Sequence, residues 1–186
     1  AQMPDVMKRA LLSIEDARFY EHHGVDYIGM TRAVVSTATG DPQGGGTITM
    51  QVARNFFLTR EKTITRKLRE IMLARRIEDA LTKDQILEIY MNQIYLGNRA
   101  YGFSAAAEAY FGKPLKSISI AEAAMLAGLP KAPSAYNPIS NPKRARSRQL
   151  YIIERMEENG FITAQQAEAA KKEELRVRPS AQDNTK

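Results

Sequence analysis

Residues 65–81 read TRKLREIMLARRIEDAL, and the spacing of their apolar side chains indicates the fold class. Apolar residues recur every three or four positions, which predicts an amphipathic helix over residues 63–81. Glu70 interrupts the apolar face, and Arg66 and Lys67 precede it at i−4 and i−3, where a cation can pair with a carboxylate. This face consists of Glu70, Leu73, Ala74, Ile77 and Leu81.

Helical signals dominate the remainder of the chain, so the predicted fold class is mainly α. Ser119 with Glu122 and Thr163 with Gln166 have the spacing of capping boxes, whereas alternating strand patterns are scarce. The expected helices cover residues 4–21, 27–38, 47–56, 63–81, 83–95, 104–111, 119–128, 142–159 and 163–174.

Length and composition suit one globular domain with a core. The sequence turns polar from Arg176, which predicts a domain over residues 1–175 and a linker or disordered tail over 176–186. No run of 18 apolar residues is present, so no membrane-spanning helix is expected. The absence of cysteine excludes disulfides and thiolate chemistry.

Basic residues are concentrated between Arg54 and Arg76, within a chain of net charge +6. Such a cluster suits a phosphate group, nucleic acid or an anionic membrane surface. A solvated helix face explains the charges equally well at this level. The members of the cluster are Arg54, Arg60, Lys62, Arg66, Lys67, Arg69, Arg75 and Arg76.

A second carboxylate lies in an unusual setting within LLSIEDARFYEHHGVD, residues 11–26. If the first helix continues to residue 21, Leu11, Leu12 and Phe19 surround Glu15, and a carboxylate partly removed from water in this way suits general acid or base catalysis. Glu70 has a cationic setting instead, and two carboxylates in contrasting settings often divide the roles of acid and base. Two structural glutamates in ion pairs remain the alternative. The adjacent His22 and His23 have no third metal ligand in view, so zinc is not favoured.

Five ordered motifs over about residues 8–175 resemble those of the peptidoglycan glycosyltransferases, family 51, as found in bacterial class A penicillin-binding proteins. EDARFYEHHG resembles the first motif, GGGTITMQVARN the second and RKLRE the third. ILEIYMNQIYLGNRAYGFSAAAEAYFGK and SIAEAAMLAGLPKAPSAYNP are similar to the fourth and fifth. The second motif departs from the family pattern at three positions, where Gly46, Met50 and Arg54 replace serine, glutamine and lysine.

The resemblance implies a lysozyme-like helical fold with a large lobe and a small membrane-facing lobe. It implies polymerisation of lipid II into β-1,4-linked glycan strands, with inversion at the anomeric carbon and release of undecaprenyl pyrophosphate. The implied partners are lipid II, lipid-linked glycan, an anionic membrane surface and inhibitors of the moenomycin type. A C-terminal transpeptidase domain is consistent with the linker-like ending. The implied location is the extracytoplasmic or periplasmic face of the bacterial inner membrane.

The resemblance also implies roles for individual residues. Glu15 is expected to be the general base, and Glu70 is expected to support the leaving group directly or through a divalent cation, Mg²⁺ or Mn²⁺. The remaining expected site residues match the motifs and are assigned to substrate. They are Asp16, Phe19 and His22 on the acceptor side, Lys62, Arg66 and Lys67 on the pyrophosphate, and Thr47, Gln51, Arg54 and Asn55 on sugar and phosphate.

Two alternative functions, a hydrolytic enzyme and a nucleic-acid-binding module, would require different features of this chain. A lysozyme or lytic transglycosylase would share the fold and one glutamate, but it would not need a cationic cluster beside a second carboxylate. A nucleic-acid-binding module would bind DNA in a salt-dependent way without using Glu15; the motifs favour no nucleic-acid partner. Apolar residues that suit membrane contact, or alternatively the core, are Tyr27, Ile28, Met30, Val34, Val35, Phe56 and Phe57.

Overall fold

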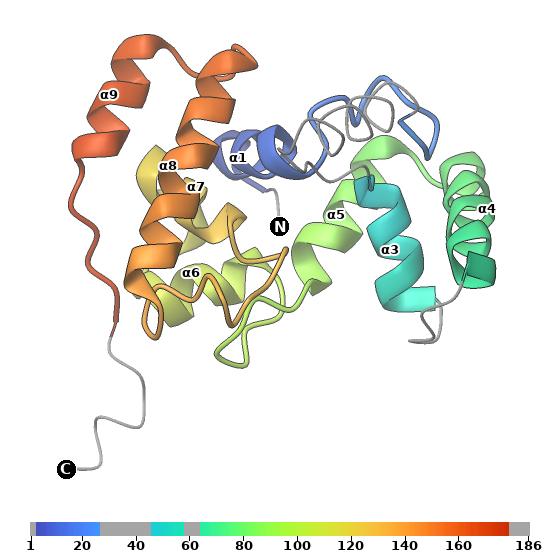
Figure 1. Cartoon of the computed structure of the whole chain (residues 1–186), viewed down its shortest axis with the longest axis horizontal. Coiled ribbons are helices and arrows are strands. Elements are labelled where there is room, and N and C mark those ends of the chain that lie inside the picture. The colour runs from blue at the N-terminus through green and yellow to red at the C-terminus, as the bar shows by residue number, and fades with distance from the viewer. Residues whose placement is uncertain (1–2, 27–45, 58–63, 179–186) are drawn as a thin grey trace. The chain divides into compact units, whose positions relative to one another are not determined.

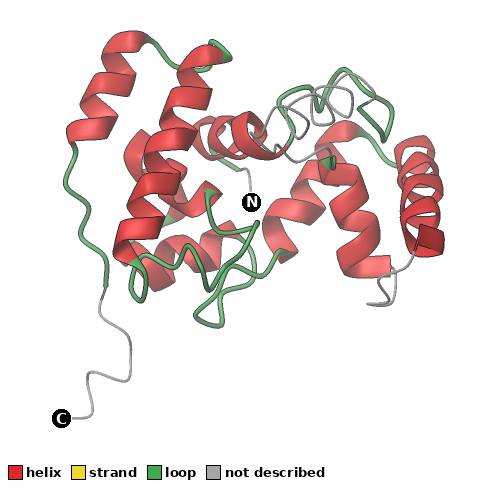
Figure 2. Ribbon diagram, viewed as in Figure 1, coloured by secondary structure: helices red, strands yellow, loops and turns green. Residues whose placement is uncertain are grey.

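The computed structural model describes residues 3–26, 46–57 and 64–178, and this part of the chain is helical (Figure 1, Figure 2). Within those ranges the β-structure consists of an isolated antiparallel bridge between Tyr95 and Tyr101. The predicted mainly α fold is confirmed. Over the same ranges, none of the helices combines the length and apolar character that a membrane span requires. The α-helices are α1 Asp5–Glu15, α3 Ile48–Phe57, α4 Ile64–Ala80, α5 Lys83–Gln93, α6 Phe103–Phe111, α7 Ile120–Ala127, α8 Pro142–Glu158 and α9 Ala164–Lys172, with a 3-10 turn at Leu115–Ser117.

The chain divides into two compact units, one formed by residues 1–14 and 91–186 and the other by residues 15–90. In the first unit α7 is the central helix. Its residues from Ala121 to Ala127 are all buried, as expected for a helix whose residues other than Glu122 are apolar. It packs against α8, α9 and α6, and Figure 1 shows α7 behind α8.

Local sequence signals set the helix ends in this first unit as predicted. Ser119 and Glu122 form a reciprocal capping box at the start of α7, and Thr163 and Gln166 form another at the start of α9. Gly102 precedes α6 with φ +82, and a Cβ there would lie 2.3 Å from the Asn92 carbonyl oxygen. Only glycine therefore allows this close backbone approach.

The second unit is built on the packing of α3 against α4. Val25, Met50 and Ala74 form its buried apolar cluster. Gly24 has φ +89, and a Cβ there would lie 3.2 Å from the backbone of Ala74 in α4. The chain after α1 can therefore cross α4 closely, which brings the first motif against the helix that carries Glu70.

The predicted helix over residues 4–21 is too long, because α1 ends at Glu15. From Asp16 the backbone enters turns in which the Phe19 amide donates to the Asp16 carbonyl and the His22 amide to the Arg18 carbonyl. The Asp16 carboxylate meanwhile accepts a hydrogen bond from the Ile48 amide. A side chain that bonds to a distant backbone group in this way competes with helix continuation. The expected helix over residues 27–38 lies outside the described residues.

The chain does not leave the first unit at the end of α9. The Arg178 amide donates to the Tyr110 carbonyl in α6 over 2.7 Å. The Arg178 guanidinium also donates to the Glu108 carbonyl. The segment after α9 is therefore held against α6 as far as residue 178.

Candidate active site

Asp16 and His22 of the first motif are joined inside the fold. His22 Nε2 lies 2.6 Å from Asp16 Oδ2, and both side chains are almost fully buried. The Gly24 amide donates to His22 Nδ1 over 3.1 Å, so Nδ1 is an acceptor and we assign the ring proton to Nε2, which donates to Asp16. The same Asp16 oxygen accepts from the Ile48 amide, at the positive end of α3. This pair fixes the first motif to the start of α3.

Phe19 occupies the core of the second unit rather than its surface. Its ring is fully buried and meets the His22 ring edge-on at a centroid distance of 5.9 Å. Lys83 Nζ lies 4.5 Å from the Phe19 ring centroid and 2.6 Å from a Glu78 carboxylate oxygen. Phe19 therefore packs against His22 inside the unit. Its predicted contact with the acceptor substrate stays a prediction.

Glu15, the last residue of α1, and Gln51 of α3 belong to the same unit and are hydrogen-bonded. Gln51 Nε2 donates to Glu15 Oε2 over 3.0 Å, and Glu15 is half-buried. On its other side Gln51 Oε1 accepts from the Tyr90 hydroxyl over 2.9 Å. Both polar groups of Gln51 are thus used within the protein, and its predicted contact with substrate stays a prediction.

Tyr90 belongs to this arrangement, although it is not among the predicted site residues. Its side chain is fully buried in α5. Burial raises the pKa of Tyr90 well above its usual value, the negative charge of Glu15 raises it further, and the positive charge of Arg54 opposes both. The hydroxyl therefore remains a proton donor at physiological pH. Within the apolar run ILEIYM, this tyrosine is indistinguishable in sequence from an ordinary core residue.

Glu70 lies beneath two cations from adjacent helices. It is 2% exposed, and its Oε1 atom lies 3.6 Å from Lys67 Nζ and 3.8 Å from Arg54 Nη1. The Lys67 and Arg54 side chains are about half and about two-fifths exposed, respectively. The pairing with Lys67 follows the predicted i,i+3 spacing, whereas Arg54 comes from α3. The carboxylate thus holds positive charge at the surface, where an anionic ligand can meet it.

Thr47 caps α3 rather than presenting its hydroxyl to solvent. The hydroxyl donates to the Gly24 carbonyl over 2.7 Å and accepts from the Met50 amide. Asn55 is exposed, and Arg66 is half-exposed on α4. Lys62 lies outside the described residues. The predicted substrate contacts of these four residues stay predictions.

The described residues around Glu70 do not fit a divalent cation held by the protein. Mg²⁺ and Mn²⁺ prefer several oxygen ligands, whereas Glu70 Oε1 faces Lys67 and Arg54. Across the described ranges, no cluster of three or more histidine, cysteine, aspartate or glutamate side chains is placed to hold a metal. The Mg²⁺ or Mn²⁺ implied by the resemblance stays a prediction, and no chemical step below passes through it.

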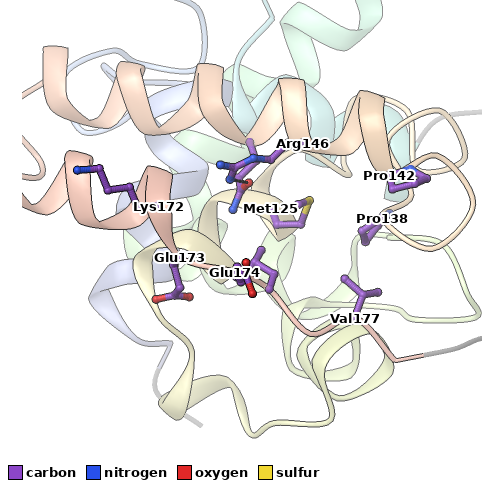
Figure 3. Close-up of a pocket in the computed structure, with 10 residues that line it drawn as sticks. Met125, Pro138, Pro142, Arg146, Lys172, Glu173, Glu174 and Val177 are labelled. Atoms are coloured by element: carbon purple, nitrogen blue, oxygen red, sulfur yellow. Dashed lines mark hydrogen bonds between the residues drawn. The ribbon is translucent and has the colours of Figure 1, made fainter.

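A cavity of about 410 Å³ lies in the other unit and includes none of the predicted site residues. Figure 3 shows Arg146 of α8 above the segment that follows α9. The Arg146 guanidinium donates to Gln149 Oε1 and to the Lys171 carbonyl, so it ties α8 to the end of α9. The cavity lining consists of Met125, Pro138, Pro142, Arg146, Gln149, Lys172, Glu173, Glu174, Leu175 and Val177.

Sequence relatives match more than nine-tenths of the chain. The chain is 58% identical over 178 residues to a protein of Cupriavidus necator whose name describes it as a transglycosylase, covering 95% of this chain and 77% of that protein. It is 57% identical to penicillin-binding protein 1A of Neisseria flavescens over 92% of this chain, and 58% identical to that of Neisseria lactamica. The chain spans 22% of the length of these two penicillin-binding proteins.

A solved structure supports the fold. The crystal structure of penicillin-binding protein 1A from Haemophilus influenzae matches with a TM-score of 0.52 and 42% sequence identity, over 53% of this chain and 15% of that chain. The family model described as transglycosylase matches residues 1–157. The chain therefore belongs to the transglycosylase family, the peptidoglycan glycosyltransferases that the motifs predict.

Proposed function

We propose that this chain polymerises lipid II into β-1,4-linked glycan strands, with the growing lipid-linked chain as donor and the 4-hydroxyl of lipid II as acceptor. The proposal rests on the different surroundings of two carboxylates, Glu15 and Glu70, within one unit. Glu15 is half-buried and hydrogen-bonded by Gln51, whereas Glu70 is buried beneath exposed cations. Such a contrast suits one carboxylate that receives a proton and one that organises charge.

Glu15 acts as the general base in this proposal. As the acceptor oxygen attacks the donor's anomeric carbon, its proton passes to the Glu15 carboxylate. The bond between that carbon and the pyrophosphate oxygen breaks, and its electron pair leaves with undecaprenyl pyrophosphate. Attack opposite the leaving group inverts the α-linkage to β. The hydrogen bond from Gln51 supports this role because it restricts the orientation of the carboxylate.

Glu70, Arg54 and Lys67 act on the leaving group. Negative charge develops on the pyrophosphate as the bond breaks, and fixed positive charge nearby lowers the energy of that state. The buried Glu70 carboxylate holds the two cationic side chains over one point at the surface. Arg66 and Lys62 are proposed to add further charge to the same anion.

The membrane surface is the proposed place of this reaction, because the substrate carries a polyprenyl chain. Exposed apolar side chains on α3 and α4 support shallow contact with lipid: Phe57, Leu68 and Met72 are each about 60% exposed. Basic residues of α4 lie among them, and Arg69 and Arg76 are also exposed. We propose that these side chains contact the extracytoplasmic side of the inner membrane, in a protein that continues into a transpeptidase domain.

Incubation of the purified chain with lipid II tests the function. The expected products are β-1,4-linked glycan chains and one undecaprenyl pyrophosphate for each bond formed. A hydrolytic enzyme would instead shorten finished glycan and leave lipid II unused. A nucleic-acid-binding module would bind DNA and convert neither substrate. Failure to consume lipid II, alongside cleavage of finished glycan, would overturn the proposed polymerisation.

A further inference from the structure

Three residues of one unit, Glu15, Gln51 and Tyr90, are joined by a chain of two hydrogen bonds. The Tyr90 hydroxyl of α5 donates to Gln51 Oε1 of α3 over 2.9 Å. Gln51 Nε2 donates to Glu15 Oε2, at the end of α1, over 3.0 Å. We propose that Tyr90 is a positioning residue for glycosyl transfer, which acts through Gln51 to set the orientation of the Glu15 carboxylate. This inference rests on the proposed role of Glu15 as the base.

The direction of the two hydrogen bonds follows from their chemistry. An ionised carboxylate only accepts hydrogen bonds, so the Gln51 amide must present its nitrogen to Glu15. The amide oxygen then faces Tyr90, whose hydroxyl must donate to it. A phenylalanine at position 90 would fill nearly the same volume but would leave the buried amide oxygen without this donor. The amide could then rotate, and the hydrogen bond to Glu15 would lose its fixed direction.

The surroundings of Tyr90 favour this role over a role in packing alone. A hydroxyl at a fully buried site costs free energy unless it is hydrogen-bonded, and this one is directed at the residue that holds Glu15. The raised pKa of Tyr90 keeps its proton in place for donation. Tyr110 provides a matched comparison: it too is fully buried, but its hydroxyl donates to the Leu96 carbonyl in the other unit.

The test measures lipid II polymerisation by the wild-type chain and by Tyr90→Phe, Gln51→Leu, the double variant and Tyr110→Phe. Loss of one such hydrogen bond is expected to lower kcat about tenfold for Tyr90→Phe, with KM for lipid II changed by less than about twofold. Gln51→Leu should lower kcat at least as much. Tyr90→Phe should cause no further loss in the Gln51→Leu background, because its effect passes through Gln51. Tyr110→Phe should keep the wild-type kcat per folded molecule.

The possible results distinguish failure of the positioning role of Tyr90 from failure of Glu15 as the base. A wild-type kcat for Tyr90→Phe, or an equal loss with and without Gln51, would overturn the positioning role. If Tyr90→Phe does not fold, Gln51→Leu carries the test, and a raised KM with unchanged kcat would contradict the proposal because Gln51 would then bind substrate directly. Glu15→Gln is included as a reference. If it retains activity, the proposed base is wrong; if it is inactive while Tyr90→Phe is normal, only the positioning role fails.

Discussion

His22 and Asp16 form a buried pair, with Nε2 2.6 Å from Oδ2 and both side chains at most 4% exposed. Removing the carboxylate leaves the His22 ring and the Ile48 amide without their acceptor. Asp16→Ala is therefore expected to lower the free energy of unfolding by about 3 kcal/mol, as measured by urea denaturation.

The exposed pair of His23 and Asp79 provides the matched control for this experiment. Its atoms lie 2.9 Å apart, but the side chains are 65% and 72% exposed. Asp79→Ala should change stability by less than about 0.5 kcal/mol, because water screens an exposed pair. Equal losses for Asp16→Ala and Asp79→Ala would show that burial does not determine the strength of these pairs.

Periodicity and capping predicted most of the described helices, because those signals are local. The capping boxes before α7 and α9 are confirmed, and Glu70, Ala74 and Ile77 of the predicted α4 face are buried. The end of α1 was mispredicted, because the Asp16 side chain bonds to the Ile48 amide, 32 residues away. No local pattern encodes that contact.

The candidate site likewise includes some contacts that the sequence predicts and others that it does not. The pairing of Glu70 with Lys67 follows from helical spacing, and the motif resemblance singles out Glu15. The contribution of Arg54 to the Glu70 pair depends on how α3 packs against α4. The link from Tyr90 to Gln51 joins residues 39 positions apart. Both contacts are tertiary, so sequence spacing alone does not reveal them.

Glu15→Gln is expected to abolish polymerisation while preserving the fold. The amide is nearly isosteric but cannot accept the acceptor's proton, and loss of a general base typically costs about 10²–10⁴ in rate. Glu21→Gln is the control, since Glu21 lies in the same motif but is exposed and pairs with Arg18. The measurement is lipid II turnover by variants whose circular-dichroism spectra match that of the wild-type chain. Near-normal synthesis by folded Glu15→Gln would contradict its assignment as base.

Replacing Arg66 and Lys67 together by Gln is expected to reduce turnover and the binding of moenomycin-type phosphoglycolipids. The reason is the loss of positive charge at the proposed pyrophosphate position. The melting temperature should change little, because both side chains lie at least partly in solvent. Arg75 and Arg76 form an equally charged, exposed pair on the same helix, and their double Gln variant should retain inhibitor binding. Loss of stability in proportion to activity would indicate structural ion pairs instead.

Tyr110 is expected to make stability fall at alkaline pH. Burial raises the pKa of Tyr110 to about 12, with a smaller contribution from Tyr95. Between pH 10 and pH 12 the unfolded chain loses this proton while the folded chain keeps it, so the free energy of unfolding declines as pH rises. The contribution is fully present below pH 10 and approaches about 3 kcal/mol in total. Tyr110→Phe should reduce the slope of this part of the urea-measured pH profile, to which Tyr90 also contributes; an unchanged slope would contradict the shift.

The exposed side chains of Phe57, Leu68 and Met72 are expected to bind anionic vesicles without a membrane-spanning anchor. Basic residues near a charged surface contribute about 1 kcal/mol each, and the exposed apolar side chains add shallow insertion. Flotation with anionic vesicles should therefore exceed flotation with neutral ones and weaken as salt rises.

Phe57→Glu should reduce vesicle binding more than it reduces stability. A charged residue at position 35 in place of Val35 is expected to have the same effect; Val35 lies outside the described residues. Tyr151→Glu, at an exposed position of α8 in the other unit, should float as the wild type does. If the wild-type chain never floats at any salt concentration, these side chains do not contact lipid, and the enzyme depends on another segment to reach its substrate.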